Sequence, residues 1–464
     1  MSSALIWIFL PFFVSVALVP FRHRRNLVIG VAAGICALLA VLAWVLPIGA
    51  AVRLGPLNLQ VSQEMVIFGR RFVLAGADRS FLVLIYIFGG VWFLGSRQAG
   101  AVDFFPGIGL ALIAMLVAAQ AVEPFLYAAL ILEMAVLLSL PLLSPPGHRA
   151  GPGTLRYLVF QTLAVPFILL AGWASGLVEA NLPGTRWVVQ AIVFLGLGFA
   201  FWLAVFPFYT WVPLLAQETS PYIFGFLLGT LPVGVLWIAL GFLDSFTWLR
   251  TSTAVMEGLR LTGGLMVLTA GIWAAFQTNL ARLLGYAILL ENGYALLAIS
   301  LNSSLGLELF AASLVPRLVG IALWSLALAV FHNHGIEPDL SSVTGVLRRY
   351  PVVSSALALA YFSLGGLPLL ASFPVRQPLL ETLAGLNLPV TVAAIVGNMG
   401  FLLGGYRLLA ALVRSDEANW HVNEGGIEAV MLGAAMVFLA LAGIFPWVVL
   451  RSSLGLVQVF THLQ

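Results

Sequence analysis

Residues 198–221, GFAFWLAVFPFYTWVPLLAQETSP, decide the fold class of this chain. An apolar run reaches Phe206-Pro207 and stops there, because proline lacks the backbone N–H that a helix needs. An aromatic turn and a polar corner follow, and a new apolar run begins at Pro221. A helix break at membrane depth is tolerated only where protein or a water-filled cavity covers it. The stretch therefore predicts an interrupted span inside a helical membrane protein.

The composition points to the same class. The 464 residues are 61% hydrophobic and 8% charged, whereas a soluble domain has about 25% charged residues. Apolar runs of about 20 residues recur along the chain, and each can cross about 30 Å of hydrocarbon. We expect an all-α polytopic membrane protein, one transmembrane domain over 1–464, embedded in the lipid bilayer. The single Cys36 excludes a disulfide framework and argues against a thiolate metal site.

Hydropathy and helix breakers divide the chain into about fourteen spans. Only the connections at 49–78 and 332–350 are long. We expect a multi-pass protein of the cell inner (plasma) membrane. The expected spans are 3–20, 27–48, 79–97, 101–120, 123–144, 154–177, 186–206, 221–243, 257–277, 281–301, 305–331, 351–383, 388–413 and 427–450.

Two patterns concern the loops. Residues 49–78 alternate apolar and polar side chains in two pieces separated by glycine and proline, which predicts a β-hairpin outside the membrane. The 21 basic residues are all arginine, and most of them fall in alternate loops. Because arginine-rich loops stay on the cytoplasmic side, this placement predicts that both termini and the hairpin lie outside.

A second interrupted span reads YFSLGGLPLLASFPVRQPLLE, residues 361–381. The seventh and the twelfth spans are therefore both broken, and they lie five helices apart. Interrupted helices at corresponding places in two halves of a chain are typical of inverted-repeat transporters. The spacing predicts two inverted five-helix repeats, at 101–243 and 257–413.

Five ionisable residues fall inside expected spans, where a charge is costly and therefore a functional hypothesis. Glu133 is either a proton-exchanging group or a structural carboxyl, and Glu291 is either a relay group or a structural partner of Arg317. Arg317 and Arg376 set a field without passing a proton on, because arginine does not deprotonate in proteins. Arg156 is close enough to the inner interface to extend toward it.

The remaining polar groups suggest no further site. Glu218, in the polar corner, is expected to cap the span that starts near Ser220-Pro221. A phosphate-binding loop, a nucleophile triad and a nucleic-acid patch are absent from the sequence, so we predict no catalytic, cofactor-binding or metal-binding residue in this chain. One cluster in the loop after the eleventh span is interpreted as solvated and not as a metal site: His332, Asn333, His334, Glu337 and Asp339.

The opening stretch resembles the motif (Lys)-L-A-x-x-P-x-H-x-W-x-P-D-x-x-x-x-A-P. That motif belongs to the antiporter-like membrane subunits of respiratory complex I, of related membrane-bound hydrogenases and of multisubunit cation/proton antiporters. Its positions here are Pro207, Trp211, Pro213, Glu218 and Pro221. Four further segments are similar to the fifth, sixth, tenth and twelfth helices of that family: ILEMAVLLS at 131–139, LRYLVFQTLA at 155–164, NLARLLGYAILLENGYALLAIS at 279–300 and GGLPLLASFPVR at 365–376.

The resemblance implies a chain of buried titratable groups that carries protons between half-channels. Glu133 falls on the family glutamate. The family's lysines on its sixth, seventh and eighth helices fall on Arg156, on Trp202 and on Pro232 or Val233. Those on its eleventh and twelfth helices fall on Arg317 and Arg376, and its tenth-helix histidine falls on Glu291. The scaffold is thus expected to be kept while the relay is altered. Burial can bring the pKa of a lysine toward neutrality, so that lysine can pass a proton on, whereas tryptophan has no proton that exchanges at such a pH.

Three functions remain open. The chain is a membrane-arm subunit of a complex I-like, redox-driven proton-translocating oxidoreductase, or a structural spacer in such a complex, or a subunit of a stand-alone cation/proton antiporter or ion-coupled uptake system. In the first two cases other membrane-arm subunits are its partners. NAD, flavin, iron–sulfur clusters and quinone are then expected in those partners, because this chain offers no ligands for redox centres.

Overall fold

The computed structural model describes residues 2–54, 57–67, 69–101, 103–145, 147, 149–179, 185–414, 420 and 422–463. Within them α-helices dominate, as the hydropathy predicts. The helices are α1 (Leu10–Leu18), α2 (Arg25–Val45), α3 (Arg79–Gly95), α4 (Phe105–Ala121), α5 (Ala128–Leu143), α6 (Pro152–Glu179), α7 (Thr185–Trp202), α8 (Trp211–Glu218), α9 (Pro221–Ser245), α10 (Thr247–Arg250), α11 (Thr253–Phe276), α12 (Leu280–Ile299), α13 (Ser304–Asn333), α14 (Pro351–Leu364), α15 (Phe373–Leu386), α16 (Leu388–Val413), α17 (Gly426–Ile444) and α18 (Pro446–Val457).

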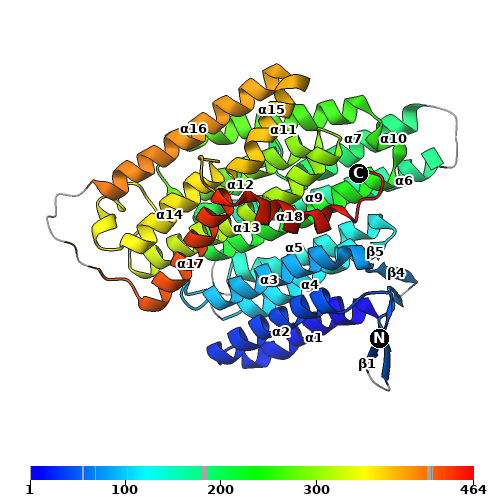
Figure 1. Cartoon of the computed structure of the whole chain (residues 1–464), viewed down its shortest axis with the longest axis horizontal. Helices are drawn as coiled ribbons and strands as arrows, with labels where there is room; N and C mark the ends of the chain where they lie inside the picture. The colour runs from blue at the N-terminus through cyan, green and yellow to red at the C-terminus, as the bar shows by residue number, and fades with distance from the viewer. Residues whose placement is uncertain are drawn as a thin grey trace.

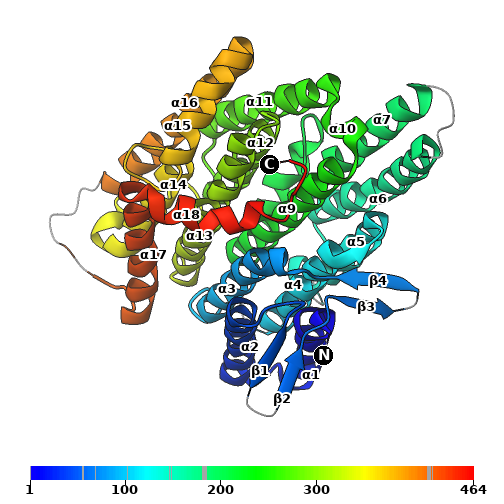
Figure 2. The same ribbon diagram turned by 45° about the vertical axis from the view of Figure 1, so that its right-hand side comes forward.

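Ten helical segments in the described part of the chain are long and apolar enough to cross a membrane, and further shorter apolar helices accompany them. The protein is therefore an all-α, multi-pass membrane protein. Figures 1 and 2 place α1 and α2 at one edge of the molecule and α16 at the opposite edge. Between them lie α9, α12 and α13, which are buried along most of their length, whereas the other long spans are less than half buried. Polar groups on these three helices are thus kept from lipid.

Both predicted interruptions are present. Helix α7 ends at Trp202, Ala204 has a positive φ of 55°, and the Phe206-Pro207 peptide bond is cis before α8 begins. In the later span, α14 and α15 are separated by a turn in which Gly366 has a φ of 68° and Leu369 a φ of 70°. Each interruption leaves backbone carbonyls without the partners that a continuous helix would supply.

Short strands follow α2. β1 (Ala51–Leu54) and β2 (Leu57–Gln60) form one antiparallel pair, and β3 (Glu64–Ile67) and β4 (Arg70–Val73) form a second. β4 also pairs with β5 (Val122–Glu123), which directly follows α4. The segment expected to hold one hairpin therefore contains two short pairs, because glycine and proline interrupt the alternation more than once. Figure 2 shows them beside the N-terminal helices.

The end of the chain differs from the expectation of one last span over 427–450. α17 ends at Ile444, and the separate helix α18 begins at Pro446. α18 contacts α3, α13 and α17, so it crosses the bundle between early and late elements (Figure 1). Proline cannot continue the hydrogen-bonding of α17, which explains the change of direction.

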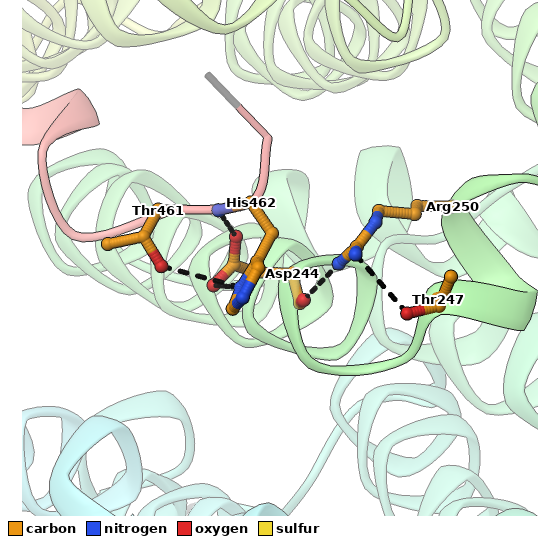
Figure 3. A network of polar contacts seen from close by, with 5 residues as sticks. All are labelled: Asp244, Thr247, Arg250, Thr461 and His462. Carbon is orange, nitrogen blue, oxygen red and sulfur yellow. Dashed lines mark hydrogen bonds and ion pairs between the residues drawn. The ribbon is translucent and has the colours of Figure 1, made fainter.

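Beyond α18 the chain reaches the carboxyl end of α9 (Figure 3). The backbone N–H of His462 donates to Asp244 Oδ1 at 2.7 Å, and His462 Nδ1 lies 3.4 Å from Asp244 Oδ2. Arg250 binds the backbone carbonyl of Asp244 at 2.6 Å and the hydroxyl of Thr247 at 3.2 Å. The ring of Phe460 packs on that of Trp237, with centroids 5.1 Å apart. The C-terminal segment is thereby attached to the buried helix α9.

Candidate functional site

A buried ion pair lies at the centre of the candidate site. Glu291 comes from the buried helix α12, and Arg376 comes from α15, after the interruption. Arg376 Nη2 lies 2.5 Å from Glu291 Oε1, and the two side chains are only 6% and 5% exposed. A buried charge is tolerated when it is paired in this way. Two of the charges predicted inside the membrane therefore meet.

The interruption allows Arg376 to reach further partners. Arg376 Nη1 donates to Asn398 Oδ1 at 2.9 Å, and Asn398 Nδ2 donates to the free carbonyl of Gly365 at 3.0 Å. The guanidinium also lies over the ring of Tyr294, 4.2 Å from its centroid. A Cβ on Gly366 would come within 2.7 Å of Arg376 Cδ. Glycine at this turn thus provides both the positive φ and the space for the arginine.

Arg317 has a different partner from the one considered in the sequence. It lies on α13, 1% exposed, and its Nη2 donates to Asn292 Oδ1 at 2.6 Å. The structural pairing of Glu291 with Arg317 is therefore wrong, since the carboxylate binds Arg376 instead. The adjacent residues Glu291 and Asn292 thus bind different arginines. The guanidinium of Arg317 donates to the oxygen of a neutral amide and not to a carboxylate. Its Nε and Nη1 have no hydrogen-bond partner among the described residues.

Glu133 lies apart from this cluster, half-buried on α5. Thr162 on α6 donates its hydroxyl to Glu133 Oε1 at 2.7 Å. The second oxygen, Oε2, is buried without a hydrogen-bond partner in the described part of the chain. Arg156 is exposed on α6, near the start of that helix. The structure therefore does not bring Glu133 into an ion pair with Arg156.

The positions where the resemblance implies lost lysines are filled by apolar packing. Trp202 is 3% exposed at the end of α7, and its ring centroid is 5.7 Å from that of Phe199. Pro232 and Val233 are buried within α9. Gln120 on α4 donates from its Nε2 to the carbonyl of Gly234, the residue after Val233, at 2.8 Å. An amide side chain of α4 thus binds a backbone carbonyl of α9 close to Pro232 and Val233.

Amide side chains also bind the carbonyls at the end of α7. Gln161 Nε2 donates to the carbonyl of Trp202 at 3.3 Å, and Asn292 Nδ2 donates to that of Leu203 at 3.2 Å. Gln161 precedes Thr162 on α6, but successive helix residues do not face the same side, and no hydrogen bond among the described residues joins Gln161 to Thr162 or Glu133. The polar groups therefore form two parts: Glu133 with Thr162, and Gln161 through these carbonyls and Asn292 to Arg317. We call this set the central polar line; it comprises Glu133, Thr162, Gln161, the carbonyls of Trp202 and Leu203, Asn292 and Arg317, with the Glu291–Arg376–Asn398 group beside it.

Five members of this site were missed by reasoning on ionisable residues alone: Thr162, Gln161, Asn292, Tyr294 and Asn398. Their signal is the same one that selected the charges, a polar side chain in the middle of an apolar run, where polar groups face the bundle interior. A small cavity of about 20 Å³ adjoins Glu291, Tyr294 and Arg376, with Ser313 and Ser372 on its other walls. A space of this size holds about one water molecule.

The aromatic motif has a structural part in this arrangement. Trp211 is buried, with its ring centroid 5.4 Å from that of Tyr157, and Pro213 packs close to Gly285 of α12. Pro207 lies in the turn before α8, and Pro221 is the first residue of α9. These prolines position the two parts of the interrupted span against α6 and α12.

The prediction that Glu218 caps the following span is wrong. Its carboxylate accepts hydrogen bonds from the backbone N–H of Gly153 at 2.8 Å and of Thr154 at 3.2 Å, so it caps the start of α6. The polar corner after α8 lies over that helix start, where the first N–H groups have no partner within the helix. A carboxylate there is also favoured by the helix dipole.

A metal site is not apparent in the described ranges, where no three His, Cys, Asp or Glu side chains are grouped suitably. Two residues of the polar cluster after α13 have other contacts. His334 Nε2 lies 3.5 Å from Glu428 Oε2, and Asn333 Nδ2 donates to the carbonyl of Gln98 at 2.7 Å.

Comparison with known proteins gives a consistent result. The family model described as NADH:quinone oxidoreductase/Mrp antiporter, transmembrane, matches residues 155–401, more than half of the chain. NADH-quinone oxidoreductase subunit N 2 of Solidesulfovibrio magneticus is 30% identical over 304 residues, which are 60% of this chain and 62% of that protein. The chain therefore spans less than two thirds of this relative.

Two other similarities extend further along the chain. NADH-quinone oxidoreductase subunit 14 of Thermus thermophilus is 26% identical over 438 residues, covering 89% of this chain and 96% of that protein. A chain in the structure of the membrane-bound sulfane sulfur reductase, an archaeal respiratory membrane complex, has a TM-score of 0.82 at 16% identity, over 99% of each chain. This second similarity shows a shared fold.

Proposed function

Because the chain belongs to the NADH:quinone oxidoreductase/Mrp antiporter transmembrane family, we propose that it is a membrane-arm subunit of a complex I-like, redox-driven proton-translocating oxidoreductase. The match of residues 155–401 carries this proposal, supported by the two relatives that are named as subunits of NADH-quinone oxidoreductase. Its partners are other membrane-arm subunits. NAD, flavin, iron–sulfur clusters and quinone are bound in partner subunits, and this chain supplies none of the redox chemistry.

The membrane arrangement forms part of the proposal. Fourteen spans are proposed, with the outer strands at 49–78 and two inverted five-helix repeats at 101–243 and 257–413. Helices lie within the expected spans, although the last span is divided into α17 and α18, and the two interruptions, after α7 and after α14, support the proposed repeats. The arginine distribution supports an inner (plasma) membrane location with both termini outside.

Membership is tested by the composition of the complex purified through this chain from its native membrane. Mass spectrometry is expected to find iron–sulfur subunits and a quinone-site subunit in equal amounts with it. The stand-alone antiporter is the alternative, and it would be favoured by co-purification with small membrane subunits alone. Recovery of the chain without redox subunits from intact, active membranes would therefore reject the proposal.

We further propose that this subunit keeps the family scaffold without conducting protons itself. The part of the central polar line from Gln161 to Arg317 is joined by the amides of Gln161 and Asn292, which donate to backbone carbonyls and are not titratable. Arg317 and Arg376 do not release protons, and Glu291 is held in the ion pair with Arg376. A relay needs groups that gain and lose protons in sequence, and between Glu133 and Glu291 this line has none.

The charge of the buried centre supports the same conclusion. It contains two guanidiniums, of Arg317 and Arg376, but one carboxylate, that of Glu291. The fixed excess of positive charge lies in surroundings of low dielectric constant, where electrostatic interactions are strong. Arginine side chains in membrane pores form electrostatic barriers to protons and cations in this way. The site therefore repels the ions that a proton path would have to accept.

The test measures protons translocated per electron by the complex reconstituted in sealed vesicles. Glu133→Gln is expected to leave this ratio unchanged, because no relay connects Glu133 to the other side. Thr162→Val serves as the matched control, since it removes only the hydrogen bond to Glu133 and keeps the carboxyl group. A lower ratio in Glu133→Gln, with electron transfer and assembly intact, would show a working path and reject the non-conducting role while leaving membership of the complex standing.

A further inference from the structure

An open, basic pocket lies at the end of the bundle opposite to the strands, away from the central polar line. It has a volume of about 650 Å³ and is lined by His23, Arg24, Arg25 and Asn26 at the start of α2 and by Arg97 and Gly100 after α3. Its arginines belong to the loops that the sequence places on the cytoplasmic side. The pocket therefore lies where the headgroups of the inner leaflet are expected.

Positive charge exceeds negative charge in this pocket. Arg25 is 3.4 Å from Asp103, and both side chains are more than half exposed. Arg97 Nη1 donates to the amide oxygen of Asn26 at 3.4 Å, which leaves its charge uncompensated. Arg24 is exposed beside them. Asp103 is the one carboxylate that pairs with these arginines within the described ranges, so the pocket retains a net positive charge.

Two exposed apolar stripes lead from this pocket along neighbouring helices. On α2 the stripe contains Leu27, Val31, Leu38, Val41 and Val45, each at least 38% exposed. On α3, which packs against α2, it contains Ile87, Val91 and Leu94, each at least 51% exposed. The residues of the α3 stripe follow one another at intervals of three or four positions, which places them on one face of the helix, and Arg97 is the next position in this series. Both stripes therefore end at the same group of guanidiniums.

We propose that the pocket binds an anionic diacyl phospholipid, with its phosphate on Arg24, Arg25 and Arg97 and its acyl chains along the two stripes. Guanidinium binds phosphate oxygens in bidentate geometry. Basic pockets between membrane helices on the cytoplasmic side suit anionic headgroups. The length of the stripes distinguishes a lipid from a free phosphate ion, because only the lipid supplies apolar surface to cover them.

The proposal is tested on the purified complex, or on the full chain if it purifies alone, in nanodiscs. These contain equal amounts of phosphatidylglycerol and phosphatidylcholine with identical acyl chains. A photo-crosslinking benzoylphenylalanine replaces Val91 on the α3 stripe, and in a control it replaces Val193, which is 50% exposed on α7. Mass spectrometry then measures the ratio of the two lipids attached to each position.

Phosphatidylglycerol is expected in excess at position 91 and near the input ratio at position 193. The excess should fall about fivefold for each arginine replaced, in Arg97→Gln and then in Arg24→Gln/Arg97→Gln, since each basic residue near the surface contributes about a factor of that size. Arg348→Gln/Arg414→Gln, with the same charge change on the same side but outside the pocket, should keep the excess. Total crosslinking yield at position 91 reports whether each variant is folded.

Three results would overturn the proposal. Equal lipid ratios at positions 91 and 193 would mean that the arginines act only as part of the cytoplasmic charge bias. Crosslinking of position 91 to another protein chain would mean that a neighbouring subunit covers the stripe. Loss of the excess on adding inorganic phosphate, at constant ionic strength, would identify a phosphate site without a role for acyl chains.

Discussion

Replacing Arg376 with glutamine is expected to lower the free energy of unfolding by about 3–5 kcal/mol, the range for removing one partner of a buried ion pair. The carboxylate of Glu291, 5% exposed, would remain in the interior without its cation. The neutral amide of glutamine is shorter and cannot restore the contact with Asn398 at the same time. The loss is measured as a lower midpoint of thermal unfolding of the protein in detergent.

An exposed ion pair supplies the matched control. Arg71 Nη2 lies 2.7 Å from Glu123 Oε2, with side-chain exposures of 57% and 36%. Arg71→Gln is expected to cost at most about 1 kcal/mol, because water and salt screen such pairs. The double variant Glu291→Gln/Arg376→Gln should recover much of the loss by removing the unpaired charge. If Arg376→Gln unfolds no earlier than Arg71→Gln, the central pair does not have the stabilising role assigned to it.

The substitution Gly271→Ala is expected to have the second large effect, by separating α11 from α16. A Cβ at this position would lie 1.7 Å from the carbonyl oxygen of Gly397 and 2.8 Å from Gly397 Cα. These are backbone atoms and cannot move aside as a side chain could. Small residues at helix contacts allow such close approach in membranes. We expect a loss of about 3 kcal/mol, at the upper end of the usual cost of overpacking.

Gly196→Ala on α7 is the control for this substitution. It is also a helical glycine, but a Cβ there meets no atom within 4 Å. Alanine should stabilise that helix by about 0.5–1 kcal/mol, because glycine is costly in a helix interior. Both variants are compared by thermal unfolding and by the fraction that elutes as a single species on gel filtration. A Gly271→Ala protein as stable as Gly196→Ala would show that the two helices are not in contact as described.

Local signals in the sequence were enough to predict the helices. Apolar runs of about 20 residues identify spans, because the thickness of the bilayer sets their length. Pro207, Gly366 and Pro368 indicated the two interruptions, because proline lacks the backbone N–H that continues a helix and glycine readily adopts a positive φ. Pro446 was a similar signal, but hydropathy continues across it, so α18 was joined to α17 in the prediction.

Contacts between distant residues could not be predicted in the same way. Glu291 lies 85 positions from Arg376 but 26 from Arg317, and sequence proximity favoured the wrong partner. Glu218 was assigned to the nearest helix start, whereas the fold brings it to α6, more than sixty positions earlier. Such pairs depend on helix rotation and packing, which a hydropathy pattern does not determine. The amides Asn292 and Asn398 could have been predicted as buried polar residues if uncharged polar side chains within the spans had been included with the ionisable ones.

The attachment of the C-terminal segment to α9 also affects the order in which the protein is made. Trp237 and Asp244 enter the membrane more than two hundred residues before Phe460 and His462 are synthesised. During that interval the carboxyl end of α9 lacks the contacts that cover it in the finished protein. Synthesis of Phe460 and His462, and not insertion of α17, supplies these contacts.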